Sequence, residues 1–320
     1  TPLGFSFPYG KYGVQLFFML SGFVNAMTLL RKKKPGQFLS SRIIRIFPVY
    51  WLVVLLNLTL LSTFVMYGQS TTPEATLANL TAMPRLFGVE NWEPVTWTLQ
   101  IELLFYGILL ILFRGGAFIN TARSMLLLLG ISLLGVPLVE QLQINLPDTL
   151  ICQLAMFLSD LLILKHLPLF VIGISLHEIW SRRGKVIDNG LVILTATFVF
   201  HSVDRHDHNP AITLFFIGLL TLSAYGKLPV LRLKPLMFLS GISYSLYLFH
   251  NNLGCLVIRS LNDLGLSPLL SILVATAFTI GIAMALTKYF EQPLTQYLKR
   301  KIEMNGSQPC FNYSTVSNKA

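Results

Sequence analysis

The sequence is poor in charge and in cysteine, and each shortage narrows the class of protein. Charged residues make up 12% of the 320 residues, about half the share of a typical soluble domain. Hydrophobic residues make up 53%, a composition that excludes an ordinary soluble domain and favours a protein embedded in a membrane. Cys152, Cys255 and Cys310 are too few and too scattered for a disulfide framework, so we expect free thiols.

Long apolar segments follow one another along most of the chain, and eight of them approach the roughly 20 residues that a bilayer crossing requires. The eight are 12–30, 47–66, 98–113, 124–142, 186–203, 211–226, 236–256 and 268–287. We expect a ninth crossing at 163–180, preceded by an interfacial or re-entrant piece at 150–162. The sequence therefore predicts an all-α, polytopic transmembrane helix bundle of about nine spans over residues 1–301. A polar, disordered cytoplasmic tail is expected over 302–320.

Basic residues are divided unevenly between the two sides of this topology. Eighteen of the 24 Lys and Arg residues fall in the loops of one side and five in the loops of the other, with Lys319 in the tail. The positive-inside rule places the richer side in the cytoplasm. We therefore expect the N-terminus outside and the C-terminus inside, in a plasma (inner) membrane. The net charge of +10 then follows from topology and from contact with membrane lipids, without a nucleic-acid partner.

A polar stripe lies inside the predicted span 236–256, because six polar residues recur there at helical spacing and fall on one face. They are Ser240, Ser243, Tyr244, Tyr247, His250 and Asn251. Polar groups are costly in hydrocarbon and normally face a protein interior or a watery cavity on a functional path. The alternative is that the hydroxyl groups hold neighbouring helices together.

Charged residues mark both ends of the predicted bundle. Arg42 and Arg45 are three residues apart on one helix face at the cytoplasmic boundary, where two guanidinium groups suit a phosphate or pyrophosphate group. Ordinary membrane anchoring explains the pair equally well. On the outer side Trp97 and Glu102 lie at the mouth of a span, in the same half of the membrane as His250. A carboxylate at that depth is a candidate proton acceptor, the alternatives being a structural ion pair or a helix cap.

A loop at 201–208 gathers three histidines and two aspartates on the outer side. Zinc sites need three or four convergent ligands, and histidines in a short polar loop are more often solvated. We therefore expect no metal site in the chain.

Five segments in order resemble motifs of the acyltransferase 3 family of integral-membrane acyltransferases. Gln15 stands where the family more often has Asp, and Thr98 where it more often has Ser. The five segments are GKYGVQLFFMLSGFV (10–24), FLSSRIIRIFPVYW (38–51), WTLQIELLFY (97–106), LSGISYSLYLFHN (239–251) and YFEQPL (289–294).

The resemblance implies transfer of an acyl group, acetyl in the first instance, from cytoplasmic acyl-CoA to a hydroxyl of an extracytoplasmic acceptor. Such an acceptor is a surface polysaccharide or another glycan or lipid-linked molecule. Acyl-CoA is then a donor substrate, and no cofactor stays bound. Glu102 and His250 are the implied catalytic residues, lining the passage or orienting the base. The implied substrate-binding residues are Arg42, Arg45, Ser21, Trp97, Ser243, Tyr244, Tyr247 and Asn251.

One departure from the family pattern concerns the family's proposed catalytic histidine, which belongs to a first helix that would precede Thr1. We expect the sequence to lack that helix, which also accounts for an N-terminus outside the membrane. Two other readings stay open: a non-catalytic family member that works as a scaffold, and a membrane transporter or flippase. Transporters usually show inverted repeats or broken helices, and the sequence has no clear repeat.

Overall fold

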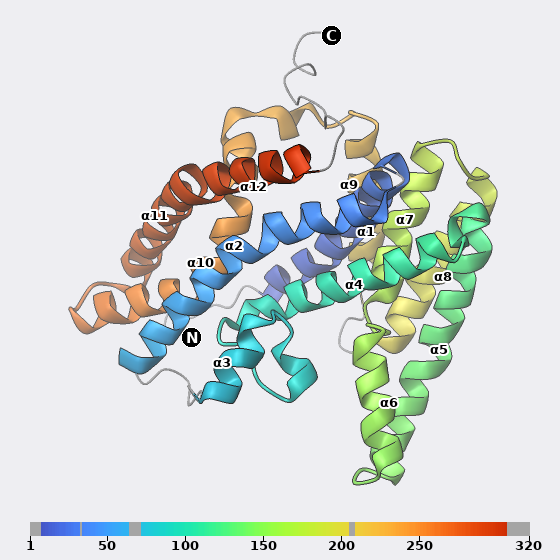
Figure 1. Ribbon diagram of the computed structural model, residues 1–320, viewed down its shortest axis with the longest axis horizontal. Coiled ribbons are helices and arrows are strands. Elements are labelled where there is room, and N and C mark those ends of the chain that lie inside the picture. The colour runs from blue at the N-terminus through green and yellow to red at the C-terminus, as the bar shows by residue number, and fades with distance from the viewer. Residues whose placement is uncertain (1–7, 33, 64–71, 205–208, 306–320) are drawn as a thin grey trace.

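The computed structural model describes residues 8–32, 34–63, 72–204 and 209–305, and these form helices and turns, with no strand among them. The predicted all-α helix bundle is thereby confirmed (Figure 1). The α-helices are α1 (Gly13–Lys32), α2 (Pro35–Thr63), α3 (Pro73–Leu80), α4 (Trp97–Arg114), α5 (Thr121–Asn145), α6 (Leu150–Leu161), α7 (Leu167–Trp180), α8 (Val186–Val203), α9 (Pro210–Ala224), α10 (Lys234–Asp263), α11 (Pro268–Leu286) and α12 (Gln292–Asn305). The shorter helices are η1 (Pro8–Tyr12), η2 (Pro84–Phe87), η3 (Pro94–Thr96), η4 (Ala117–Ile119), η5 (Pro229–Arg232) and the π-helix η6 (Thr287–Glu291).

Six helical segments of the described chain are long and apolar enough to cross a membrane, so the protein is an integral membrane protein. The six are Gly10–Arg31, Pro35–Leu60, Pro94–Arg114, Thr121–Asn145, Val186–Val203 and Pro268–Lys301. Helices α7 and α9 are apolar but shorter, with 14 and 15 residues. Helix α10 has 30 residues, and its polar side chains keep it out of the six. That the protein crosses the membrane nine times stays a prediction.

Helices α1 and α7 cross at a pair of glycines. A Cβ on Gly22 of α1 would overlap the carbonyl oxygen of Phe170, and a Cβ on Gly173 of α7 would overlap the carbonyl oxygen of Met19. Small residues at such a crossing let two backbones touch, which is how membrane helices commonly gain packing contact. The rings of Phe18 and Phe170 lie beside this crossing with centroids 4.9 Å apart. The crossing fixes α1 against the start of α7, where residues of the site described below are found.

The segment from α3 to η3 forms a cap that packs against the middle of α2 and leads into the start of α4. Tyr50 of α2 donates its hydroxyl proton to the carbonyl oxygen of Asn79 at 2.7 Å, and the indole N–H of Trp51 donates to that of Leu80 at 3.0 Å. Inside the cap, the Asn79 side chain accepts a hydrogen bond from the backbone N–H of Trp92. These bonds hold the turn that leads into α4 and its Trp97.

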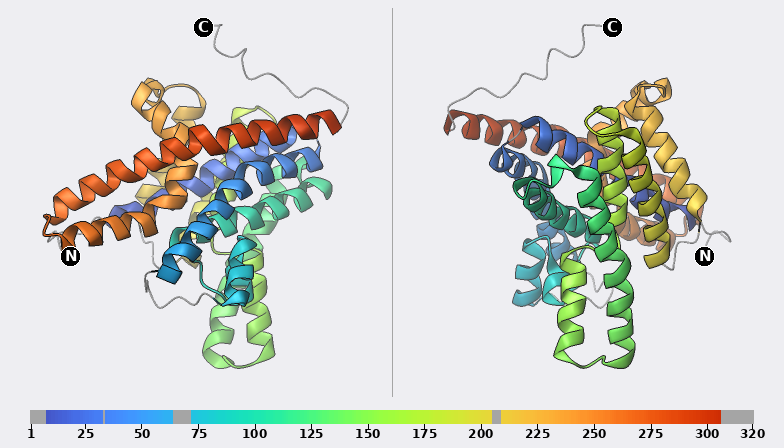
Figure 2. Two further views of the ribbon diagram at one scale, coloured as in Figure 1. Left: turned by 60° about the vertical axis from the view of Figure 1, so that its left-hand side comes forward. Right: turned by 90° about the vertical axis from the view of Figure 1, so that its right-hand side faces the viewer.

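The region 150–180 is divided as the sequence predicts, since α6 ends at Leu161 and α7 begins at Leu167. Helix α6 has 12 residues, too few to cross a bilayer. It lies along α5, and the two form a hairpin that projects from the rest of the bundle (Figure 2). An interfacial position for α6 stays a prediction.

The last part of the chain is a long helical hairpin. Helix α10 ends at Asp263, Gly265 adopts a positive φ of 86°, and Pro268 begins α11, the usual order of glycine after a helix and proline at the start of the next. Helix α11 continues through η6 into α12 as one run across the molecule (Figure 2). Helix α12 extends to Asn305, a few residues past the predicted domain boundary at 301, and residues 306–320 of the predicted tail lie outside the described residues.

Candidate active site

Polar side chains of α1 and α4 meet inside the bundle around one carboxylate. The hydroxyl of Ser21 donates to Oε1 of Glu102 at 3.1 Å, and the hydroxyl of Tyr106, one turn further along α4, donates to the same oxygen at 2.6 Å. Hydrogen bonds to an ionised acceptor are among the strong ones. Two such donors on one oxygen fix the direction in which the Glu102 carboxylate points.

The network continues along α1 toward Arg42. Asn25 donates from its side-chain nitrogen to the carbonyl oxygen of Ser21 at 2.8 Å and to the hydroxyl oxygen of Ser21 at 2.9 Å. About one turn further, the hydroxyl of Thr28 accepts a hydrogen bond from Nη2 of Arg42 at 3.3 Å. Polar groups therefore line the inner face of α1 over two turns, from the Glu102 carboxylate to the Arg42 guanidinium.

Arg42 and Arg45 differ in their surroundings although both lie on α2. The guanidinium of Arg42 lies over the rings of Phe38 and Tyr106, 5.4 Å and 5.7 Å from their centroids, and the residue is 9% exposed. Stacking on aromatic rings holds a guanidinium in a fixed orientation. Arg45 is exposed, and its charge acts on Tyr106 and on Tyr244 of α10. Arg42 therefore faces Tyr106, whereas Arg45 is exposed on the same helix.

At the first turn of α4, Trp97 belongs to a cluster of rings that no pattern in the sequence predicts. Its indole lies against the imidazole of His166, with centroids 5.5 Å apart, and against the edge of Phe18. His166 in turn contacts Phe18 at 5.4 Å, and the guanidinium of Arg85 lies over the Trp97 ring. Because Phe18 lies one turn before Ser21 on α1, His166 is positioned next to the polar network by the crossing of α1 with α7.

Two tyrosines of α10 attach this helix to α4 and α2. The hydroxyl of Tyr247 lies 2.6 Å from that of Thr98 and hydrogen-bonds to the carbonyl oxygen of Val95. The hydroxyl of Tyr244 donates to the carbonyl oxygen of Ile46 at 2.7 Å. These bonds bring the middle of α10 against the two helices that carry Glu102 and the arginines.

Three other members of the predicted stripe, Ser240, Ser243 and His250, are exposed on α10, whereas Asn251 is half-buried. Ser243 and His250 each bond to their own helix: Ser243 donates to the carbonyl of Ser240, and Nδ1 of His250 lies 2.8 Å from the carbonyl oxygen of Tyr247. With Leu239 and Leu246 they line a shallow hollow of about 480 Å³. The structure does not bring His250 to the Glu102 network, and the expectation of an inward stripe is met by Tyr244 and Tyr247.

A second buried carboxyl group, not singled out in the sequence, lies where α10 meets the cap. Asn252 donates to Oδ1 of Asn57 at 2.6 Å and to the carbonyl of Trp92 at 2.7 Å, and Asn251 donates to the side chain of Asn252 at 3.3 Å. Glu93 is buried beside them in the loop before α4, and burial raises its pKa to about 8 against the opposing effect of the three asparagines. The signal in the sequence is asparagine inside apolar helices, which needs a buried partner.

A third carboxylate lies in the π-helix η6. Oε2 of Glu291 accepts the hydroxyl of Ser245 at 2.8 Å and that of Thr287 at 3.3 Å. The charge of Glu291 also acts on Tyr244. The YFEQPL segment of the sequence contains this residue, and single π-turns inside helices often mark functional places.

The first motif of the sequence is joined to α9 through Gln15. The hydroxyl of Thr213 donates to Oε1 of Gln15 at 3.0 Å, and the imidazole of His201 lies 3.0 Å from the same hydroxyl. The remaining histidines of the loop 201–208 fall at residues 205–208, outside the described residues. In the part of the chain that the structure describes, no group of three metal-ligating side chains gathers.

The arrangement combines an oriented carboxylate with a guanidinium group two helical turns away, inside a membrane bundle. A carboxylate held by hydroxyl donors suits proton transfer, and a guanidinium suits an anionic reactant. These features make the network the candidate active site, with groups suited to acid–base chemistry on a polar or phosphorylated reactant.

Comparison with known proteins identifies the family. Residues 2–288 match the model of the family described as "Acyltransferase domain" (Acyl_transf_3), nearly the whole chain. The chain belongs to this family and is an acyltransferase, which confirms the prediction from the motifs. It is also similar to the exopolysaccharide production protein ExoZ of Rhizobium meliloti (strain 1021), with 27% identity over 309 residues covering 91% of each protein. No solved structure matches the chain.

Proposed function

We propose that the protein transfers an acyl group, acetyl in the first instance, from acyl-CoA in the cytoplasm to a hydroxyl of a glycan outside the plasma membrane. Family membership supports the acyl transfer, and the name of the similar ExoZ protein, which refers to exopolysaccharide production, supports a glycan acceptor. The observation that carries the proposal is the hydrogen-bonded path from Asn25 through Ser21 and Glu102 to Tyr106, beside Arg42.

On the donor side, Arg42 and Arg45 hold the phosphate groups of acyl-CoA. Arg42 is pre-oriented by Thr28 and by the Phe38 ring, so little side-chain freedom is lost when it binds an anion. Arg45 is exposed and free to meet phosphates that arrive from the water. This role requires the Arg end of α2 to face the cytoplasm, as the distribution of basic loops predicts.

In the transfer itself, the acceptor hydroxyl oxygen bonds to the thioester carbonyl carbon and the carbon–sulfur bond breaks. The acceptor thereby loses a proton, and CoA leaves as a thiol. The Glu102 carboxylate, oriented by Ser21 and Tyr106, takes the proton from the acceptor and returns it to the departing sulfur. His250 is the second candidate for this exchange, from the outer surface of α10.

On the acceptor side, Trp97 and the neighbouring His166 present flat rings to a sugar. Tyr247 holds α10 against the start of α4, and Tyr244 holds it against α2. The exposed Ser243 and the half-buried Asn251 line the route along α10 toward this position. We expect these groups to orient the acceptor hydroxyl toward the thioester carbonyl.

The test separates chemistry from donor binding. In membranes that contain the protein and labelled acetyl-CoA, Glu102→Gln should lower kcat at least about a hundredfold and leave KM for acetyl-CoA nearly unchanged. The double variant Arg42→Ala, Arg45→Ala should raise that KM about tenfold or more. Arg114→Ala, an exposed arginine at the end of α4, serves as the matched control and should keep both constants.

Wild-type turnover in Glu102→Gln would contradict the proposal, provided that the variant elutes like the wild type in size-exclusion chromatography. A flippase would move the acceptor without consuming acetyl-CoA. A scaffold would consume none in any variant, so acetyl-CoA consumption by the wild type excludes both.

A further inference from the structure

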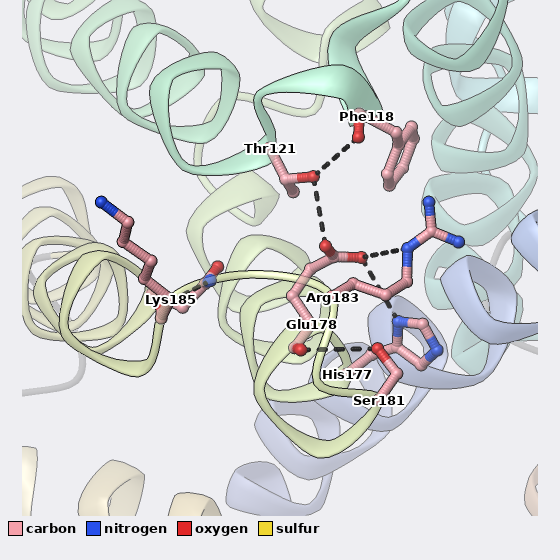
Figure 3. A network of polar contacts seen from close by, with 8 residues as sticks. Phe118, Thr121, His177, Glu178, Ser181, Arg183 and Lys185 are labelled. Atoms are coloured by element: carbon pink, nitrogen blue, oxygen red, sulfur yellow. Dashed lines mark hydrogen bonds and ion pairs between the residues drawn. The ribbon is translucent and has the colours of Figure 1, made fainter.

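A polar pocket of about 440 Å³ lies at the edge of the bundle, away from the Glu102 network. It is formed where α7 ends and where α5 and α8 begin, so two helix N-termini meet at one place (Figure 3). The lining residues are Phe118, Ile119, Asn120, Thr121, Ala122, Glu178, Arg183, Gly184, Lys185, Asp188 and Asn189.

A buried carboxylate forms the floor of this pocket. Glu178 is 3% exposed, and its Oε2 accepts the hydroxyl of Thr121 at 3.4 Å. Its Oε1 lies 3.9 Å from Nε of Arg183 and 3.6 Å from Nδ1 of His177 (Figure 3). No hydrogen-bond donor of the described chain reaches Oε1. Oε1 therefore has two cationic or titratable neighbours within 4 Å but no hydrogen bond within the described chain, and a buried carboxylate oxygen without a hydrogen bond is costly, so it is free to accept one from a ligand.

Asn189, on the neighbouring wall of the pocket, also has a buried oxygen that receives no hydrogen bond from the described residues. It is 2% exposed, and its side-chain nitrogen donates to the carbonyl of Lys185. A Cβ on Gly184 would overlap the Asn189 side chain, so the backbone of this turn comes close to the amide. Two buried acceptor atoms, one of them charged, therefore lie in one pocket without donors.

The rim of the pocket carries the complementary charge. Arg183 and Lys185 are exposed beside it, and residues of the first turns of α5 and α8 line it. Arginine, lysine and helix N-termini together favour a phosphate group. The lining thus contains two positive side chains, Arg183 and Lys185, and two negative ones, Glu178 and Asp188. This charge distribution is complementary to a zwitterionic ligand with an ammonium group at one end and a phosphate group at the other.

The surroundings of the pocket are apolar. Ile119, Val186 and Ile187 next to it are 91%, 65% and 77% exposed. Isoleucine and valine at such exposure fit contact with acyl chains, because α5 and α8 are long and apolar enough to cross a membrane and the pocket lies where both begin. The pocket thus opens where a bilayer changes from hydrocarbon to headgroups.

We propose that this pocket binds the headgroup of a membrane phospholipid with a primary amine. The ammonium group donates hydrogen bonds to Glu178 Oε1 and Asn189 Oδ1, while the phosphate meets Lys185, Arg183 and the two helix N-termini. The acyl chains extend along Ile119 and Ile187. The site is independent of the proposed donor and acceptor.

The experiment compares lipids that differ in one feature each. The full-length protein, purified in detergent, is incubated with phosphatidylethanolamine, phosphatidylcholine or phosphatidylglycerol and analysed by native mass spectrometry. Phosphatidylethanolamine should bind about tenfold more tightly than phosphatidylcholine, whose quaternary ammonium has no N–H to donate. It should also bind more tightly than phosphatidylglycerol, which has no cation for Glu178.

Variants assign the preference to the pocket. Glu178→Gln should abolish the preference for phosphatidylethanolamine over phosphatidylcholine. Lys185→Ala, a change of an exposed residue, should lower the binding affinity for both lipids about tenfold. Asp148→Asn, which removes an exposed carboxylate between α5 and α6, is the matched control and should bind like the wild type.

Equal binding of the three lipids, or a preference that survives Glu178→Gln, would overturn the proposal. A soluble ligand is tested in thermal-shift measurements with phosphoethanolamine, which has both the amine and the phosphate, and with 3′,5′-adenosine diphosphate, which has phosphate groups without an ammonium group. If either compound stabilises the wild type but not Lys185→Ala while phosphatidylethanolamine shows no preference, the pocket serves a soluble ligand and the lipid assignment is wrong.

Discussion

Tyr106 serves two neighbours at once within the site. Its hydroxyl donates to Glu102, and its ring lies under the guanidinium of Arg42. A phenylalanine would keep the second contact and remove the first. The residue therefore allows the contribution of one hydrogen bond to be measured while the ring packing is preserved.

We predict that Tyr106→Phe lowers kcat for acyl transfer about tenfold to a hundredfold, since a hydrogen bond to a charged group is typically worth about 1.5–3 kcal/mol. KM for acyl-CoA should change little because the ring under Arg42 remains. The measurement is steady-state acyl transfer in membranes. Tyr225→Phe, at an exposed position after α9, is the control, and an equal loss in both variants would refute the prediction.

Glu93 gives a prediction of pH dependence. Burial raises the pKa of this carboxyl from 4.5 to about 8, so the folded protein holds a proton that the unfolded chain has released between these values. Stability from this group is complete below about pH 4.5 and is lost as the pH rises toward about 8. The slope is at most about 1.4 kcal/mol per pH unit.

Glu93→Gln resembles the protonated carboxyl and should remove this slope. Thermal unfolding of wild type and variant across the range from about pH 5 to about pH 8 measures the difference. The wild type should lose stability relative to Glu93→Gln as the pH rises. Glu90→Gln, in the same loop but exposed, should follow the wild type, and parallel curves for the wild type and Glu93→Gln would contradict the assigned burial.

Single residues also show what a sequence can disclose. Ser21 and Asn25 lie one turn apart in the sequence and hydrogen-bond as that spacing suggests, and Glu102 is placed by its motif. His166 could not be found in this way, because its place beside Trp97 depends on the pairing of α7 with α1. Helical periodicity states which face a residue occupies, and says nothing about which helix covers that face.

At the level of secondary-structure elements, the crossing of α1 and α7 requires glycine at positions 22 and 173, because a Cβ at either position would overlap the backbone of the other helix. We predict that Gly173→Ala lowers thermal stability in detergent, at a cost of about 1–3 kcal/mol, because overpacking against the Met19 carbonyl exceeds the helix propensity that alanine gains. Gly130→Ala in α5, where nothing lies within 4 Å of the added Cβ, should be neutral or stabilising. Equal melting temperatures for the two variants would show that the helices do not cross at Gly173.

Helix α10 shows the limit of a pattern read from one element. The stripe of six polar residues occupies a broad arc, and only part of an arc can face the neighbouring helices. Tyr244 and Tyr247 reach α2 and α4 with long side chains, whereas Ser243 and His250 stay on the surface. The buried polar residues include Ser245 and Asn252, which are paired with Glu291 and Asn57. These partners come from other parts of the chain, so the stripe alone could not select them.

At the level of the whole molecule, the topology follows from charge and can be measured. We predict that a cysteine at Asp148, between α5 and α6, reacts with a membrane-impermeant reagent from outside intact cells, and that a cysteine at Lys227, after α9, reacts only after lysis. The basic loops make the second position cytoplasmic. The native cysteines are replaced beforehand, and reaction of both positions from the same side would exclude the predicted topology.

Fold class and family were within reach of the sequence because both depend on composition and on short motifs in order. Helix boundaries were close, with α2 the exception: it begins at Pro35, so Arg42 and Arg45 lie inside the same helix as the span expected from 47. The predicted span began where the apolar run begins, but a helix continues through polar residues wherever its backbone hydrogen bonds are satisfied. The pocket around Glu178 joins α5, α7 and α8 and had no signal in any one segment.

The glycine contact between α1 and α7 has a consequence for biosynthesis. Its two halves lie about half a chain length apart, so α1 enters the membrane long before α7 leaves the ribosome. During that interval the Gly22 surface must be covered by lipid or by the insertion machinery. Co-translational assembly of this enzyme therefore waits for α7, and a ribosome stalled before α7 should leave a nascent chain that proteases degrade quickly.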